Sequence, residues 1–444
     1  MRAALFHIPI MPTVALTTLG CKLNFAETST IGKQFLDRGY SVVRFGDQAD
    51  VTVINTCSVT GRADRECRQL IRRARRIAPN GTVIVTGCYA QLDPETVASI
   101  DGVDYVLGTQ EKFSVFRHTG SPTRQEITRV IVSPAGAVDD FGPAYSTEAG
   151  NRTRAFLKVQ DGCDFHCTFC TIPRARGGSR SQSIDACLQQ ASELVGRGYR
   201  EIVLTGVNVG DYGRKDGGLL VLLRELVQIR GMERLRISSI EPNLLTDPLI
   251  EFIAAEDVMC KHVHVPLQSG SDTVLHAMRR RYTREHYAGR MRSVREKIKG
   301  CGIGIDVIVG FPGEGEREFE ETHRFLEDLP LTYLHVFTYS ERPETPAASF
   351  AGRVSPAERA RRSEVLRQLG MKKKKAFQET LVGMTLPVLV EAEEGEGCRC
   401  GFTGNYVRVA LPAESAEGNS IVDVAITGVD GDRCTGVIMG GKSG

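Results

Sequence analysis

The chain has 444 residues, of which 41% are hydrophobic and 25% charged, and its formal net charge is +2. This length exceeds what one compact core usually holds and predicts roughly two to four domains of ordinary globular composition. A net charge this small excludes a strong overall electrostatic attraction to nucleic acid, so RNA contacts would need local basic patches. The sequence has no run of about 18 apolar residues and no secretory cleavage site at its start, so we expect no membrane partner.

The cysteine count is the unusual part of this composition. There are 13 cysteines at irregular spacing. An odd number in a chain of this size does not fit a secreted disulfide framework. We therefore expect a cytoplasmic protein in which some cysteines are thiolates bound to metal.

Residues 13–120 alternate apolar strands with polar helical stretches, which is typical of an open parallel α/β sheet. The expected strands are Val14–Leu19, Val51–Asn55 and Val83–Thr86. The expected helices are Glu27–Arg38 and Asp64–Ile77. Residues 121–152 lose this periodicity and collect Ser, Thr, Pro and Gly, which indicates a linker.

Residues 153–379 repeat a strand-then-helix unit six times, which predicts a partial (β/α)6 barrel open on one side, because a full eight-unit barrel typically needs about 250 residues. The expected strands are Phe156–Val159, Glu201–Thr205, Leu235–Ser238, His262–Pro266, Gly304–Val309 and Tyr333–Thr338. The expected helices are Asp185–Arg197, Leu219–Ile229, Ser271–Met278, Glu316–Leu326 and the basic stretch Pro356–Glu379.

Residues 380–444 change character again, with short Val- and Ile-rich strands between Gly, Glu and Asn turns. This pattern predicts a small β-barrel, a class that often binds nucleic acid on one face. The expected strands are Pro387–Glu391, Tyr406–Ala410, Ile421–Thr427 and Cys434–Met439.

A CxxxCxxC motif, formed by Cys163, Cys167 and Cys170, follows the first strand of the predicted partial barrel. Three thiolates from one short loop can each bind one iron of a four-iron cluster and leave the fourth iron without a protein ligand. Such an open position lets a metal centre bind and activate a substrate. Zinc is the competing interpretation, but short zinc sites usually present paired ligands and a fourth Cys or His, which only His166 could supply here.

Three further cysteines, Cys21, Cys57 and Cys88, each stand at the end of a predicted strand in the first segment. The carboxyl ends of strands in an open parallel sheet lie along one edge, where ligands bind. Three cysteines at the same position in this pattern are therefore expected to converge. One buried cysteine at a strand end would need no such explanation.

Together these motifs resemble the radical S-adenosylmethionine (SAM) superfamily and, within it, the methylthiotransferases. The resemblance covers nearly the whole chain, with three domains in the expected order. It rests on the segments Leu19–Glu27, Asn55–Cys57, Thr86–Cys88, Ala155–Cys163, Cys167–Gly177, His264–Ser271 and Gly310–Glu314.

The resemblance implies two [4Fe-4S] clusters and SAM as cofactors. SAM on the open iron of the first cluster would yield a 5′-deoxyadenosyl radical that takes hydrogen from an unactivated carbon. A second SAM would methylate a sulfur carried by an auxiliary cluster on Cys21, Cys57 and Cys88. An electron donor and a sulfur source of unknown identity are implied as partners. The implied SAM contacts are Thr205, Gly206, Ser239, Glu241, Gln268, Ser269, Ile308 and Gly310.

Local basic features indicate a polyanionic partner, although each alone is more simply a solvated surface. The tail resembles the TRAM-type RNA-binding module, which favours contacts to backbone phosphates. One basic helix face carries Arg65, Arg68, Arg72, Arg75 and Arg76. The expected RNA contacts are Arg174, Arg176, Arg180, Lys372, Lys373, Lys374 and Lys375.

The motifs Lys22-Leu23-Asn24 and Gln160-Asp161-Gly162 resemble the branch that acts on threonylcarbamoyl-adenosine in the tRNA anticodon stem-loop. The predicted reaction is methylthiolation at C2 of that adenine. An arginine near the radical cluster would suit the carboxylate of the threonylcarbamoyl group, through two charge-assisted hydrogen bonds. His166 departs from the pattern, which has a bulky apolar or aromatic residue there.

Other functions remain open at this point. Within the family, the substrate could be a prenylated tRNA adenosine or a ribosomal protein aspartate. Outside it, the chain could be a non-enzymatic iron–sulfur carrier or an RNA-binding module with structural zinc, although a carrier explains neither the barrel nor its strand-end motifs. Cys398 and Cys400 are expected to be exposed incidental thiols. The remaining cysteines, expected to be packing residues, are Cys67, Cys187, Cys260, Cys301 and Cys434.

Overall fold

The structure is a computed structural model, and it describes residues 11–137, 141–146, 153–213, 218–395, 397–412 and 416–439. The chain forms two compact units. The first comprises Met1–Thr147 with Thr171–Gly178, and the second comprises Glu148–Cys170 with Ser179–Gly444. Among the described residues, no helix has the length and apolarity needed to cross a membrane.

The first unit is built on a six-stranded parallel sheet with the order β2-β1-β3-β4-β5-β6, which confirms the predicted open α/β sheet. Every residue of the two central strands is buried, as expected for a parallel sheet covered on both faces. The sequence pattern does not indicate β2, β5 or β6, because three residues are too few for a periodic signal. The strands are β1 (Thr13–Thr18), β2 (Ser41–Val43), β3 (Val51–Thr56), β4 (Thr82–Gly87), β5 (Tyr105–Leu107) and β6 (Arg129–Ile131).

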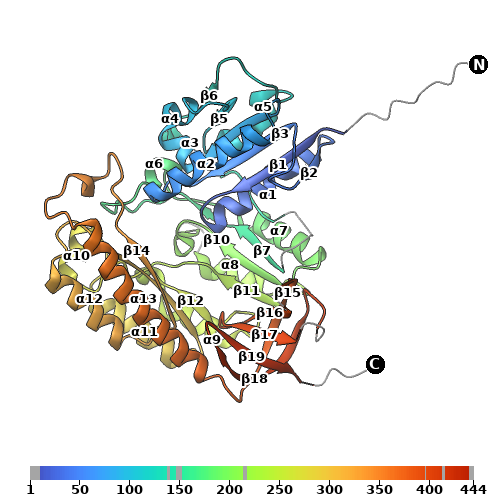
Figure 1. The fold of residues 1–444 in the computed structure, drawn as a ribbon. Helices are drawn as coiled ribbons and strands as arrows, with labels where there is room; N and C mark the ends of the chain where they lie inside the picture. The colour runs from blue at the N-terminus through green and yellow to red at the C-terminus, as the bar shows by residue number, and fades with distance from the viewer. Residues whose placement is uncertain are drawn as a thin grey trace, which may run out of the picture. The chain divides into compact units, whose positions relative to one another are not determined.

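Helices of the first unit follow the strand ends. The first helix begins directly after Cys21, five residues before the predicted start, and its first turn already buries Leu23 and Asn24. A short helix from residues 171–178, drawn in green, packs among the blue helices of this unit (Figure 1). The helices are α1 (Lys22–Leu36), α2 (Gly61–Ile77), α3 (Cys88–Leu92), α4 (Pro94–Ala98), α5 (Val115–Thr119) and α6 (Ile172–Arg176).

The second unit contains the predicted partial barrel. Six parallel strands form two three-stranded sheets, β11-β10-β7 and β12-β13-β14, joined by a single bridge between Leu235 and Met259. A short antiparallel pair, β8 (Gln160–Asp161) and β9 (Arg180–Ser181), flanks the cysteine loop. The barrel strands are β7 (Arg154–Lys158), β10 (Glu201–Thr205), β11 (Arg234–Ile237), β12 (His262–His264), β13 (Gly302–Val309) and β14 (Tyr333–Thr338).

Helices connect these strands, and most match the predicted stretches to within three residues. Two of the helices between the strands, α9 and α11, have no predicted range, and α11 is so rich in Arg, Glu and Lys that its apolar side is narrow. The basic stretch forms one 24-residue helix, α13, with the predicted bounds. The helices are α7 (Ile184–Gly196), α8 (Leu219–Leu226), α9 (Asp247–Ala255), α10 (Asp272–Ala277), α11 (Arg284–Lys297), α12 (Glu316–Asp328) and α13 (Pro356–Glu379).

The C-terminal residues form a closed five-stranded barrel with the order β15-β16-β17-β19-β18, coloured orange to red in Figure 1. This confirms the predicted small β-barrel, with one strand, β16, that the pattern does not indicate. The strands are β15 (Thr385–Gly395), β16 (Cys398–Thr403), β17 (Arg408–Pro412), β18 (Ile421–Asp430) and β19 (Arg433–Ile438).

The turn between β16 and β17 closes the amino-terminal end of the partial barrel. Arg234 and Arg236 donate hydrogen bonds from their Nη1 atoms to the carbonyls of Phe402 (2.9 Å) and Gly404 (3.1 Å). Arg236 is buried and also binds the Glu201 carboxylate at 2.7 Å. The small barrel is therefore part of the core of the second unit, because its turn satisfies buried guanidinium groups.

Candidate active site

The structure brings the three strand-end cysteines of the first unit together. Cys21, Cys57 and Cys88 directly follow, or lie within three residues of, the neighbouring strands β1, β3 and β4. Gly20 has a φ of 102°, and a Cβ atom there would lie 2.9 Å from the Sγ atom of Cys57, so only glycine permits this approach.

Burial, with smaller contributions from the nearby Cys88 and Cys21, raises the pKa of the Cys57 thiol to about 12. Cys21 is exposed as a residue, but the protein atoms around its thiol displace water and raise its pKa, against a lowering effect of Arg176. Thiolates at such positions need a bound cation, because a metal ion deprotonates a coordinating thiol outright. The donor set therefore fits a metal cluster.

A buried polar cluster lies beside Cys21. The Glu27 carboxylate binds Arg176 Nη1 at 2.9 Å and Lys112 Nζ at 2.7 Å. Arg176 also donates from Nη2 to Asn24 Oδ1 at 2.6 Å, and all four side chains are at most 1% exposed. Arg176 belongs to α6, only six residues after Cys170 of the other cysteine motif. Its side chain is thus occupied within the first unit and is not exposed to an RNA phosphate.

The cysteines of the CxxxCxxC motif lie on one half-buried loop of the second unit that follows β8. Burial, with a smaller contribution from the charge of Cys167, raises the pKa of Cys163 to about 11. Arg280 donates from Nη1 to the Sγ atom of Cys167 at 3.2 Å, a contact that stabilises a thiolate. The residues present therefore fit a cluster with three thiolate ligands and an exposed side.

The residues expected to contact SAM lie at or beyond the carboxyl ends of β10, β11, β12 and β13, the end at which β/α barrels keep their active sites. A Cβ atom on Gly206 would lie 2.9 Å from the Gln160 carbonyl, which explains the glycine. Gln268 has a φ of 72°, an uncommon conformation for a residue other than glycine.

Two of the other residues expected to contact SAM, Glu241 and Ser269, interact with side chains of the protein. The Glu241 carboxylate forms an ion pair with Arg280, a residue the sequence reasoning missed. Ser269 is buried against Thr322, with 3.3 Å between their hydroxyls. Ile308 is half-buried near the end of β13, and Gly310 follows it with a φ of 77°. The role of all these residues in binding SAM stays a prediction.

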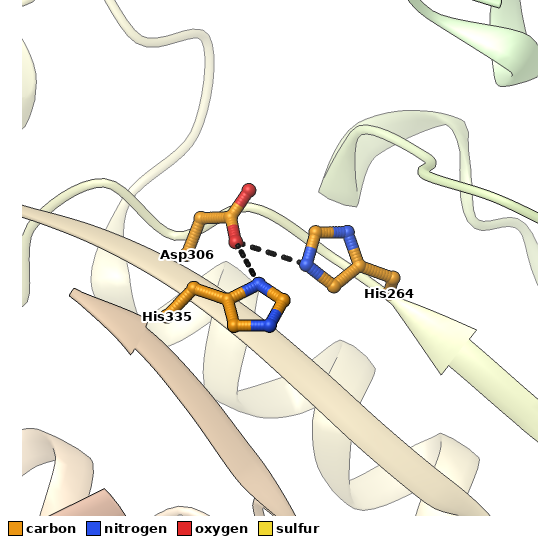
Figure 2. Close-up of side chains that lie close together, drawn as sticks. All are labelled: His264, Asp306 and His335. Carbon is orange, nitrogen blue, oxygen red and sulfur yellow. Dashed lines mark hydrogen bonds and ion pairs between the residues drawn. The ribbon is translucent and has the colours of Figure 1, made fainter. Parts of the chain in front are cut away.

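A cluster of two histidines and one aspartate lies on β12, β13 and β14 (Figure 2). Asp306 Oδ1 accepts hydrogen bonds from His264 Nε2 at 2.9 Å and His335 Nδ1 at 3.1 Å. Burial alone would raise the pKa of Asp306, but these two hydrogen bonds lower it to about 2. The sequence reasoning missed this cluster, because each strand contributes single polar residues that no spacing rule connects.

The predicted RNA contacts differ in accessibility. Arg180 is half-buried and lies 3.7 Å from Asp161, and Arg174 is half-buried on α6. Lys373 donates to the Leu329 carbonyl at 3.0 Å, and Lys374 lies 3.4 Å from Asp432. The exposed lysines of this group are Lys372 and Lys375, and Lys375 lies 3.9 Å from Glu379 on the same helix.

The basic face of α2 is similarly divided. Arg68 donates to the Tyr89 hydroxyl at 3.0 Å and Arg75 pairs with Asp104 at 2.9 Å, so both have partners inside the protein. The exposed members of this face are Arg65, Arg72 and Arg76.

The remaining cysteines are mostly core residues. The expectation that Cys400 is exposed is wrong, because it is 7% exposed and faces inward from β16. Arg433 Nη1 lies 3.4 Å from the half-buried Cys398 Sγ. The cysteines predicted to be packing residues are all buried, namely Cys67, Cys187, Cys260, Cys301 and Cys434.

Two family models match separate parts of the chain. Residues 13–108 match the family described as Uncharacterized protein family UPF0004, and residues 157–326 match the Radical SAM superfamily. The threonylcarbamoyladenosine tRNA methylthiotransferase MtaB of Bacillus subtilis is 42% identical over 94% of each chain. The protein of the same name from Aquifex aeolicus is 39% identical over 89% of this chain and 96% of its own.

A tRNA-2-methylthio-N(6)-dimethylallyladenosine synthase from Desulfosudis oleivorans is also similar, at 32% identity over 93% of this chain and 92% of its own. Among solved structures, the radical SAM methyltransferase TsrM from Kitasatospora setae, with tryptophan and a SAM analogue bound, has a TM-score of 0.58. It covers 86% of this chain and 79% of its own at 14% identity, a likeness that concerns the fold alone.

The matching superfamily and the cysteine loop identify SAM and an iron–sulfur cluster as cofactors. The similarity of the whole chain to the named enzymes identifies it as a transferase. The chain belongs to the radical SAM methylthiotransferase family, in the branch of the threonylcarbamoyladenosine tRNA methylthiotransferases.

Proposed function

We propose that this protein adds a methylthio group to C2 of the adenine of N6-threonylcarbamoyladenosine, next to the tRNA anticodon. The observation that carries this proposal is the presence of two separate cysteine triads, one at the carboxyl ends of parallel strands and one on a single loop after β8, in a chain that matches a named enzyme over 94% of its length. A single triad would supply radical chemistry without an obvious place for a second sulfur-bearing cluster.

The radical site is assigned to Cys163, Cys167 and Cys170. When bound there, a four-iron cluster with SAM supplies the radical that removes hydrogen from a carbon no side-chain acid or base could deprotonate. The contact of Arg280 with Cys167 offsets negative charge on the cysteine ligands. Arg280 is itself held by Glu241, so this pair fixes the position of one ligand.

The auxiliary site is assigned to Cys21, Cys57 and Cys88, with Asn24 holding the helix start that follows Cys21. Asn24 Nδ2 donates to the carbonyls of Leu19 at 2.9 Å and Thr56 at 3.0 Å, which ties the ends of β1 and β3 together. These residues would hold the cluster that carries the inserted sulfur. A sulfur source and an electron donor are therefore further partners in the proposal.

Exposed cations are the proposed contacts to the tRNA phosphates. Lys372 and Lys375 on α13, together with the exposed arginines of α2, have side chains available to a polyanion. Each phosphate contact should weaken with salt, because binding releases condensed counterions. Arg176 is not included, because its guanidinium is buried against Glu27.

Changing Cys21, Cys57 and Cys88 together to alanine should remove about half of the iron, or about four of about eight atoms, and abolish methylthiolation. SAM cleavage should persist, because the other triad keeps its ligands. Iron and sulfide analysis with detection of 5′-deoxyadenosine measures both effects. Full iron content in this variant would show that the auxiliary assignment is wrong.

Expression in a strain that lacks this modification should restore the doubly modified nucleoside, methylthio-threonylcarbamoyl-adenosine. Mass spectrometry of digested tRNA is the measurement, and the variant lacking Cys163, Cys167 and Cys170 is the control. Recovery of methylthio-prenyl-adenosine would overturn the substrate and leave the reaction type intact. Absence of any methylthio nucleoside, with a modified ribosomal protein aspartate instead, would overturn tRNA as the substrate.

A further inference from the structure

The His264–Asp306–His335 cluster faces the inside of the partial barrel. In the parallel register Asp306 pairs with His335, and His264 pairs with Gly304, two residues before Asp306 on the same face. The alternate residues of β13, including Ile305 and Val307, are fully buried on the opposite face. Because β14 is the last strand of its sheet, His335 lies at the open side of the partial barrel.

The cluster forms one hydrogen-bonded chain that begins at the edge assigned to SAM. The Ser239 hydroxyl lies 2.8 Å from His264 Nδ1, so both nitrogens of His264 are engaged. His335 uses only Nδ1 toward Asp306, and its Nε2 points away from the carboxylate (Figure 2). No described residue forms a hydrogen bond with this Nε2, and the side chain is 54% exposed.

A cavity of about 310 Å³ adjoins His335 along the edge of β14. Its floor is the ring of Tyr333, which occupies the space that a side chain at position 304 would fill. Phe402 and Tyr406 form another wall, with ring centroids 5.1 Å apart. Tyr406 has a φ of 68°, so its position is held at a conformational cost.

Two cations line the same cavity, Lys374 and Arg408. Each has a carboxylate partner, the exposed Asp432 at 3.4 Å for Lys374 and the half-buried Glu391 at 3.2 Å for Arg408. Surface ion pairs of this kind contribute little to stability, so a ligand carboxylate can replace either partner. The cavity is thus lined by aromatic rings, by an imidazole whose Nε2 forms no hydrogen bond with a described residue, and by two cations.

We propose that this cavity receives the polar N6 arm of the substrate nucleoside. His335 Nε2 hydrogen bonds with the arm, and Lys374 and Arg408 face its carboxylate. The inference rests on the proposed function. It assigns binding of the threonylcarbamoyl carboxylate to Lys374 and Arg408, whereas the sequence analysis assigned it to an arginine near the radical cluster. An apolar prenyl arm would offer the imidazole no hydrogen bond and the two cations no carboxylate, so it would gain nothing from these groups.

The test compares binding of the full-length, cluster-loaded protein to tRNA with and without the threonylcarbamoyl group. The wild type should bind the modified tRNA more tightly, and His335→Phe should reduce that preference about ten- to a hundredfold. Its affinity for unmodified tRNA and its iron content should not change, a separation that a merely structural role would not produce. His286→Phe, on the exposed side of α11, is the matched control and should keep the preference.

A second variant, Lys374→Ala with Arg408→Ala, should lose the same preference and retain the hydrogen bonds of Asp306. An unchanged preference in both variants, or equal binding of the two tRNAs by the wild type, would overturn the inference. Zinc bound stoichiometrically by the wild type and lost in His335→Phe would also overturn it, because the cluster would then be a metal site. Methylthiolation of prenyl-adenosine by the wild type would instead contradict the proposed function itself.

Discussion

Replacing Cys163, Cys167 and Cys170 together by alanine is expected to abolish SAM cleavage and to leave about half of the iron, or about four of about eight atoms. The reason is that all three thiolates of this site come from one loop, so no other described cysteine lies in position to replace them. Detection of 5′-deoxyadenosine with iron and sulfide analysis measures the effect. The expected loss of activity is complete.

The same substitution at three core cysteines is the control. Cys187, Cys301 and Cys434 are fully buried and lie in segments that carry none of the six predicted ligands, so alanine there should cost some stability and leave iron and SAM cleavage unchanged. Residual 5′-deoxyadenosine formation in the first variant, at a rate close to that of the wild type, would mean that the radical cluster is bound elsewhere.

Arg176→Met is expected to destabilise the first unit by about 3–5 kcal/mol, because it removes one partner of a buried ion pair and leaves the Glu27 carboxylate undercompensated. The Nη2 hydrogen bond to Asn24 is lost as well. Chemical denaturation, followed by a signal from the first unit, measures the change. Because Asn24 holds the start of α1, iron retention by the auxiliary triad should fall with it.

Arg174→Met, two residues earlier on the same short helix, is the matched control, because Arg174 is half-buried and the substitution is identical. It should change stability by less than about 1 kcal/mol. If Arg176 were an RNA contact, the outcome would be reversed: tRNA affinity would fall while the unfolding free energy stayed unchanged.

Both cysteine triads could be predicted from the sequence, because one is a local motif and the other repeats the same position at the end of three strands. Cys163, Cys167 and Cys170 share one loop, so spacing alone brings them together. For Cys21, Cys57 and Cys88 the inference needed one physical rule, that parallel strands end along a common edge. The same periodic signals identified the longer strands and α13, since apolar repeats persist over enough residues to be recognised.

Only the tertiary structure decided the role of the charged residues. Arg176 looks like a substrate contact in the sequence, yet it binds Glu27, which lies 149 residues away in the chain. His264, Asp306 and His335 meet only because three strands pair in one register, and the base of the partial barrel is closed by a turn 168 residues beyond the arginine that it binds. The ion-pair partner of a charged residue cannot be predicted from the local sequence, because the folded backbone determines which side chains are buried together.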